Sequence, residues 1–437
     1  NSIMVRDVAF AASRKFIWDA MTVDLGKYQP MAMSYYSKEG NPLWEKESTI
    51  AVANTLKTYS KHTINYPYPV AISVHAASIG MEYPMICFNF GRPNKNGKYS
   101  DAVKWGMISV IIHEVGHNFF PMIINSDERQ WTWMDEGLNT FVQTLTQKEF
   151  YSDGPLRRGT AQSMVNYMKG DKEGIRPIMT NSEQILQFGN NAYGKPAAAL
   201  SILRETIMGP KLFDYAFKEY ARRWAFKHPD PADFFRTMED ASAIDLDWFW
   251  KGWFYTTDNV DVSVEKVKWY KMRNPKKLFD NKSNFDDKDI ISDKGLTTND
   301  RAPYSIPNKP TYFLFETSKE SSSRGGEFRN KIDEEKVKLK NANKNFYEVT
   351  FKNIGGLVTP LIIEWSFEDG SKEIERIPAE IWRSNENEVT KVFVKNKVVQ
   401  NIKLDPFLET ADTNVSDNNI PRLIIESKFD NFNKSKN

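Results

Sequence analysis

The stretch HEVGHNFFPMIINSDERQWTWMDEGLNTF, residues 113–141, contains two histidines four residues apart and a glutamate, Glu136, that is separated from the second histidine by eighteen intervening residues. Residues four apart on an α-helix differ by about 40° in azimuth, so His113 and His117 can direct imidazole nitrogens at one cation. Glu114 is displaced by about 100°, which suits a general base beside the cation. Two histidines and a glutamate form a known catalytic zinc set. The stretch predicts one zinc ion held by His113, His117 and Glu136.

A buried helix with two hydrogen-bonded histidines is the alternative interpretation of this stretch, because the five-residue motif also arises by chance. Residues 105–117, WGMISVIIHEVGH, are strongly apolar. A glutamate within them would be costly to bury without a partner such as a metal. His113 and His117 are also two of only five histidines in the chain. These observations favour the zinc site.

Composition narrows the class of protein. The chain has 437 residues, of which 40% are hydrophobic and 27% charged, which is typical of a globular protein of two to four domains. Its formal net charge of +2 does not indicate nucleic acid or an anionic membrane as a partner. Cys87 is the single cysteine, so an intrachain disulfide is excluded. No apolar run is long enough for a transmembrane helix.

Apolar periodicity outlines a first domain over residues 1–265. Residues 1–20 are expected to contain an entering strand and residues 48–62 a helix, while residues 67–76 and 84–90 have the composition of short strands. The spacing predicts a helix from Asp101, as its cap, to about Phe120, before Pro121. Residues 128–256 are expected to be almost wholly helical, with two helices meeting near Ser242.

The composition changes after this domain. Residues 266–345 are expected to form a polar connector, residues 346–427 a small all-β module, and residues 428–437 a polar tail. Within the module, LIIEWSF is followed by Asp369-Gly370 and the alternating KEIERI, which is a hairpin signature. The predicted fold class is therefore α+β, with a mostly helical domain followed by a β-sandwich-like domain.

Three further motifs resemble those of a known family in order and spacing. Residues 80–84 read GMEYP, residues 133–137 read WMDEG, and residues 192–200 read AYGKPAAAL. Together with HEVGH and Glu136, they are similar to the motifs of the M1 zinc aminopeptidases, the gluzincins that include aminopeptidase N and leukotriene A4 hydrolase. The resemblance covers about residues 1–260. It implies a thermolysin-like catalytic domain that hydrolyses the N-terminal residue from peptides.

The resemblance also assigns roles to individual residues. It implies that Glu114 and Tyr193 are catalytic, Tyr193 as hydrogen-bond donor to the oxyanion. Glu82 would bind the free α-ammonium of the substrate, alongside Met81 and Gly80. Where relatives usually carry Asn, this chain has Tyr83 and Asp135, and where many carry Glu it has Gln143. We expect Asp135 and Gln143 to contact the ligands rather than the metal.

Two other readings of the function remain open at this stage. One is an endopeptidase or other hydrolase on the same zinc site, and the other is a non-catalytic binding protein with a fossil site. The chain opens at Asn1 without the β domain that precedes the catalytic domain in relatives, so a mature form or fragment is expected. The Asn- and Lys-rich loops and the β module suggest an exported bacterial protein, periplasmic or surface-attached, with a cytoplasmic location left open. The oligomeric state is not indicated.

Overall fold

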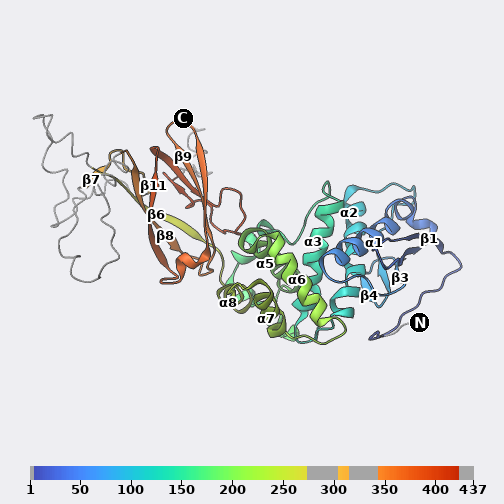
Figure 1. Ribbon diagram of the computed structural model, residues 1–437. Coiled ribbons are helices and arrows are strands. Elements are labelled where there is room, and N and C mark those ends of the chain that lie inside the picture. The colour runs from blue at the N-terminus through green and yellow to red at the C-terminus, as the bar shows by residue number, and fades with distance from the viewer. Residues whose placement is uncertain (1–3, 273–303, 314–342, 423–437) are drawn as a thin grey trace, which may run out of the picture. The chain divides into compact units, whose positions relative to one another are not determined.

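The computed structural model describes residues 4–272, 304–313 and 343–422 (Figure 1). The chain divides into two compact units. The first unit comprises Asn1–Asp258 with Glu409–Ala411, and the second comprises Asn259–Leu408 with Asp412–Asn437. The chain mixes helices and sheets, and the strands of the second unit lie toward the C-terminus. Among the described residues, no helix is both long and apolar enough to cross a membrane.

The first unit contains a five-stranded sheet in the order β1-β2-β3-β5-β4. Its strands are β1 (Ile17–Thr22), β2 (Met31–Tyr36), β3 (Val70–His75), β5 (Ile86–Asn89) and β4 (Met81–Tyr83). Strands β2, β3 and β5 run parallel, whereas β1 and β4 are antiparallel edge strands. The strands expected within 67–76 and 84–90 are thus confirmed. The short edge strand β4 carries Glu82 opposite Cys87.

The strand expected within residues 1–20 is confined to its last residues. Residues 7–13 have no regular structure, and β1 begins only at Ile17. The apolar side chains that suggested the longer strand are exposed, with Val8 at 75% and Phe10 at 88%. Apolar composition alone misled the prediction, because a strand also needs a neighbour for its backbone hydrogen bonds.

Three helices form the centre of the first unit: α1 (Leu43–His62), α2 (Asp101–Gly116) and α3 (Leu138–Phe150). They pack against one another (Figure 1), and α2 also contacts β5. The cap of α2 is Ser100, whose side chain accepts a hydrogen bond from the Val103 amide, rather than the predicted Asp101. Burial of the apolar face of α2 holds the residues that follow it in place.

The remaining α-helices of the first unit follow α3 along the chain. They are α4 (Val165–Met168), α5 (Lys195–Ile202), α6 (Pro210–Trp224), α7 (Pro231–Ser242) and α8 (Asp247–Tyr255), with wide helical turns at Asn118–Ile123, Trp133–Gly137, Gly189–Gly194 and Leu203–Met208. The mostly helical character expected for this part of the chain is confirmed, including the break after Ser242. Aromatic rings link α7 to α8, with Phe234 and Trp250 centroids 5.8 Å apart.

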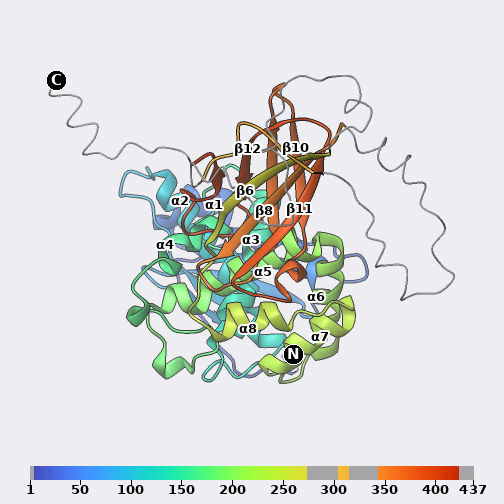
Figure 2. The same cartoon turned by 90° about the vertical axis from the view of Figure 1, so that its left-hand side faces the viewer.

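The second unit contains two four-stranded sheets, ordered β10-β9-β12-β13 and β11-β8-β6-β7 (Figure 2). The bounds are β6 (Val262–Met272), β7 (Thr311–Phe313), β8 (Asn345–Asn353), β9 (Leu361–Phe367), β10 (Lys372–Ile377), β11 (Glu388–Lys395), β12 (Val399–Leu404) and β13 (Asn419–Ile420). Side chains from the two sheets meet, with the Trp365 and Phe393 rings 4.9 Å apart. The hairpin predicted at Asp369-Gly370 is confirmed by the antiparallel pairing of β9 with β10.

The boundary expected at residue 265 differs from the structure. Strand β6 begins at Val262 and continues to Met272, inside the expected connector, because it pairs with β8 along most of its length. Strand β7 also falls in the expected connector. The rest of that connector, residues 273–303 and 314–342, lies outside the described residues, as do residues 423–427 and the tail at 428–437.

Candidate metal centre

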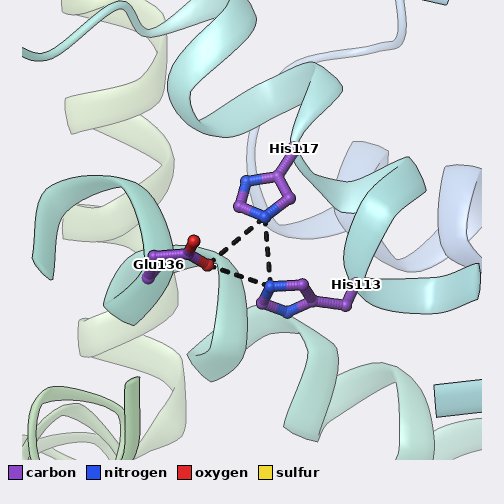
Figure 3. Close-up of side chains that lie close together, drawn as sticks. All are labelled: His113, His117 and Glu136. Atoms are coloured by element: carbon purple, nitrogen blue, oxygen red, sulfur yellow. Dashed lines mark hydrogen bonds and ion pairs between the residues drawn. The ribbon is translucent and has the colours of Figure 1, made fainter. Parts of the chain in front are cut away.

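His113 in the last turn of α2, His117 at its C-terminal cap and Glu136 in the turn before α3 converge on one point (Figure 3). The two Nε2 atoms are 3.0 Å apart, and Glu136 Oε2 lies 3.0 Å from His113 Nε2 and 3.3 Å from His117 Nε2. The chain returns Glu136 to the histidines after leaving helical geometry at Phe120. The three side chains predicted as ligands are therefore brought together.

This spacing suits a tetrahedral zinc ion. Bonds of about 2.0–2.2 Å to nitrogen and oxygen place neighbouring ligand atoms of a tetrahedron about 3.3–3.5 Å apart. The observed separations of 3.0 to 3.3 Å are close to that value. The same three residues form a cluster of donors suited to a cation within the described part of the chain. The donor set and the geometry both fit zinc.

Hydrogen bonds at Nδ1 aim both imidazoles at this point. Gln143 Oε1 lies 3.1 Å from His113 Nδ1, and its Nε2 donates to the Ser109 hydroxyl at 2.8 Å. His117 Nδ1 lies 2.9 Å from Asp135 Oδ1 and 2.8 Å from the Phe120 carbonyl oxygen. A proton held at Nδ1 leaves the Nε2 lone pair free for a metal. Gln143 and Asp135 thus contact the expected ligands.

Glu114 lies beside the three ligands with only 6% of its surface exposed. Burial raises the pKa of its carboxyl to about 7, although the nearby His117 and His113 oppose the shift. Gly80 lies directly against it, since a Cβ at Gly80 would come within 2.7 Å of Glu114 Oε1. The structure therefore places the predicted base and the start of the predicted substrate-binding motif side by side.

Tyr193 reaches the same centre from the turn Gly189–Gly194. Its ring stacks on that of His113, with centroids 5.6 Å apart and planes inclined by 25°. Burial raises the pKa of the Tyr193 phenol well above its usual range, and the charge of Glu136 and a hydrogen bond to it act in the same direction. The hydroxyl stays protonated at neutral pH and can donate a hydrogen bond.

Glu82 lies near His117 in this cluster. Its carboxylate belongs to a group with His117 and Asp135 whose potential ligand atoms all lie within 4.8 Å of one another. Its negative charge contributes to raising the pKa of Glu114, after burial. Met81, its neighbour on β4, is 37% exposed, and the Tyr83 ring packs edge-on against Phe88 rather than entering the cluster.

Comparison with known proteins agrees with these motifs. Residues 49–253 match the model of the Peptidase family M1 domain. The chain carries a peptidase family M1 domain. Glu114, Glu136 and Tyr193 all lie within the matched M1 residues. Glu82 and its neighbours on β4 also lie within this range, in its early part.

Relatives of this M1 domain are distant and longer. A probable aminopeptidase 1 of Sulfurisphaera tokodaii is 22% identical over 248 residues, which are 51% of this chain and 30% of that protein. Human glutamyl aminopeptidase is 24% identical over 216 residues, 48% of this chain and 22% of that protein. The chain therefore spans less than a third of the length of these relatives.

A solved structure shares the fold. The Legionella pneumophila aminopeptidase A, crystallised in complex with aspartic acid, matches with a TM-score of 0.50 and 12% identity. The match covers 88% of this chain and 35% of that one. At this identity the likeness concerns the fold alone.

The M1 centre brings several carboxylates close to two histidines. Their charges and their burial shift the pKa values of these acids. Burial acts to raise the pKa of Glu136, but His117 and His113 outweigh it and hold that pKa below its usual range. Burial raises the pKa of Asp135, and the charge of His117 opposes the shift. A divalent cation placed among these carboxylates would balance their negative charge.

Sequence reasoning missed several residues that support the M1 centre. Asn139 Nδ2 donates to the His113 carbonyl oxygen at 2.9 Å, and the Tyr59 hydroxyl donates to Asn139 Oδ1 at 2.6 Å. Arg158 places its guanidinium carbon 4.7 Å from the centre of the Tyr193 ring. Asn139 sits one helical turn after Glu136, a spacing that could have marked it, whereas nothing local in the sequence marks Arg158 or Tyr59.

Proposed function

We propose that the first unit is a zinc-dependent aminopeptidase that hydrolyses the N-terminal residue from peptides. The observation that carries the proposal is the convergence of His113, His117 and Glu136 with Glu114 and Glu82 on one point. A metal site alone would serve many hydrolases. A second carboxylate beside that site, on the edge strand β4, accounts for selection of a free amine.

One zinc ion held by His113 Nε2, His117 Nε2 and Glu136 Oε2 would supply Lewis-acid polarisation of a carbonyl group and activation of a water molecule. Three protein ligands leave a coordination position open for reaction, as in catalytic zinc sites. Gln143 and Asp135 orient the histidines through their Nδ1 atoms. A thermolysin-like catalytic domain, with the second unit as a β-sandwich domain, is part of this proposal.

Glu114 acts as the general base. Its carboxylate takes a proton from the attacking water and passes it to the amine that leaves when the peptide bond breaks. A pKa of about 7 suits both steps, because the group then accepts and releases a proton near neutral pH. Gly80 lies close enough to limit the positions that this carboxylate can take.

Tyr193 donates a hydrogen bond to the oxyanion that forms when water attacks the carbonyl. Its stacking on His113 holds the ring beside the reacting carbonyl. A donor aimed at the site of developing charge stabilises the transition state more than the substrate. The phenol has to remain protonated for this role, and its raised pKa ensures that.

Glu82 pairs with the α-ammonium group of the substrate. A charge-assisted hydrogen bond to this group favours a free N-terminus. A blocked N-terminus or the interior of a peptide offers no cation, so the Glu82 carboxylate loses its partner on binding. Peptides with free N-termini are therefore the proposed substrates. An endopeptidase on the same zinc site is the second candidate function, and a non-catalytic binding protein is the third.

The test uses two matched peptides, one with a free N-terminus and one acetylated, followed by mass spectrometry with and without a zinc chelator. We expect stepwise loss of single residues from the free peptide only, abolished by the chelator. Glu82→Gln should raise KM for the free peptide, and Glu173→Gln, an exposed control in the same unit, should not. Cleavage inside both peptides would favour the endopeptidase. Absence of cleavage by zinc-loaded protein would favour the binding protein.

A further inference from the structure

A cavity of about 570 Å³ opens on the His113 side of the metal centre. Helices α2 and α3 form two of its walls, the loop after α3 and the turn that carries Tyr193 form two more, and Gly80 before β4 and Phe90 after β5 complete it. Its lining includes His113, Glu114 and Tyr193 but not Glu82. Gly80, two residues before Glu82, belongs to the lining, so the cavity begins beside the strand of the proposed amine-binding carboxylate and extends along α2 and α3.

This arrangement sets the direction of a bound peptide, and the argument rests on the proposed function. With its ammonium group at Glu82 and its first carbonyl at the metal centre, a peptide can continue past Gly80 into this cavity. The residue after the cut enters the cavity on the His113 side. Val110, one helical turn before Glu114, and the aromatic ring of Phe188 form apolar parts of this wall.

The cavity has a strongly positive rim. Arg157 and Arg158 both contribute to the lining, and both are exposed. Within the described residues that line the cavity, Glu114 carries the single carboxylate. Across residues 4–272, 304–313 and 343–422, no acidic side chain forms an ion pair with Arg157 or Arg158. The rim thus holds two cations without an anionic partner in the described part of the chain.

Arg158 lies within reach of the substrate. Its guanidinium carbon is 4.7 Å from the centre of the Tyr193 ring, and that ring is 5.6 Å from the His113 ring. These two distances place the guanidinium at most about 10 Å from His113. A peptide residue spans about 3.3–3.6 Å, so the guanidinium lies within about three residues of the cut, and a carboxylate on the first or second residue beyond it is within reach. Contact with a ring face leaves most of the five N–H donors of arginine available.

We infer that Arg158, with Arg157 beside it, binds a carboxylate carried by the first or second residue after the scissile bond. A guanidinium presents paired donors that match the two oxygens of a carboxylate. This carboxylate has two chemical sources: the C-terminus of a dipeptide or tripeptide, or the side chain of Asp or Glu in a longer peptide. The preferred substrates are short or acidic on the C-terminal side of the cut.

A purely structural role for Arg158 gives a different expectation. The guanidinium could serve only to hold the Tyr193 ring, through the cation–π contact. Its removal would then affect all peptides to the same extent, whatever group follows the cut. A specific effect on carboxylate-bearing ligands separates the two roles.

The test measures binding, so that it does not depend on turnover. Zinc-loaded protein with Glu114→Gln is titrated calorimetrically with alanyl-alanine and with its C-terminal amide. We expect the free acid to bind about tenfold more tightly, the size of one charge-assisted hydrogen bond at an accessible site. Adding Arg158→Gln should remove this preference. Adding Arg236→Gln, an exposed arginine on α7 outside the cavity lining, should preserve it.

A second pair of ligands identifies the source of the carboxylate. Amidated pentapeptides with Glu or Gln at the second position are compared in the same three proteins. A preference for Glu that Arg158→Gln removes would extend the inference to acidic side chains, and its absence would restrict it to the peptide C-terminus. Equal binding of acid and amide in both pairs, or a preference that survives Arg158→Gln, would overturn the inference. Hydrolysis of the same peptides by the unmodified protein tests the proposed function separately.

Discussion

Replacing Gly80 with alanine is expected to impair catalysis by moving Glu114. A Cβ at Gly80 would lie 2.6 Å from Val110 Cγ2 and 2.7 Å from Glu114 Oε1, whereas ordinary contacts begin at 3.4 Å. Relief therefore requires displacements of about 0.8 Å and 0.7 Å, the differences between these distances. Val110 is β-branched and sits on α2, so its side chain has little freedom to give way.

The Glu114 carboxylate is the more mobile of the two neighbours, so it should take most of the displacement. A misplacement near 1 Å of a reacting group costs about 10²-fold in rate. We expect kcat/KM of Gly80→Ala on a free dipeptide to fall by about that factor. The zinc content should not change, because Gly80 contacts none of the three ligands closely.

Gly106→Ala provides the matched control. Gly106 lines the same cavity from α2, but a Cβ there would meet only Phe90, at 3.7 Å. This variant should keep its activity and gain up to about 1 kcal/mol of stability from the helix preference for alanine. The prediction is tested by measuring kcat/KM and zinc content for both variants. Activity of Gly80→Ala within threefold of the parent would refute the link between Gly80 packing and the position of Glu114.

Three further outcomes are expected. Gln143→Leu should weaken zinc affinity about 10- to 100-fold in a chelator competition, because His113 Nδ1 loses its acceptor; Gln147→Leu, one turn along α3, should not. Tyr193→Phe should lower kcat about 10²- to 10³-fold with KM little changed, because one oxyanion donor is removed; an equal rise in KM would contradict this role. Burial lowers the pKa of Lys195 to about 8 from 10.5, so the unfolded chain binds more protons between these values. The unfolding free energy should therefore rise by about 3 kcal/mol from pH 7.5 to 10.5 relative to Lys195→Met in paired urea titrations; parallel pH profiles would contradict the buried charge.

The N-terminal segment and the cap of α2 show where local reasoning failed. The apolar pattern of residues 1–20 resembles a strand, but strand formation depends on a neighbouring strand that the pattern does not identify. The cap was assigned to Asp101 although Ser100 precedes it, because both residue types cap helices well. The end of the first domain was predicted at residue 265, whereas β6 already begins at Val262. The sequence of β6 does not reveal that this strand pairs with β8 in the second unit.

Local sequence patterns were sufficient to predict features that lie within a single helix or a single hairpin. Helical periodicity places His113 and His117 on one face, and Asp369-Gly370 with its alternating flanks specifies a hairpin. These features depend on bond geometry over a few residues, so the amino-acid order alone determined them. The similarity of the motifs to the M1 family likewise required no coordinates.

Tertiary structure decided which residues from different helices, strands and turns come into contact. Glu136 reaches the histidines because the chain leaves helical geometry at Phe120 and returns in the turn before α3. Gln143 contacts His113, and Arg158 contacts Tyr193, because packing brings their separate elements together. Such distances are set by the burial of many side chains that are far apart in sequence, and no local pattern encodes them. The amino-acid order therefore determined which chemistry is present, and packing determined its geometry and the charge around it.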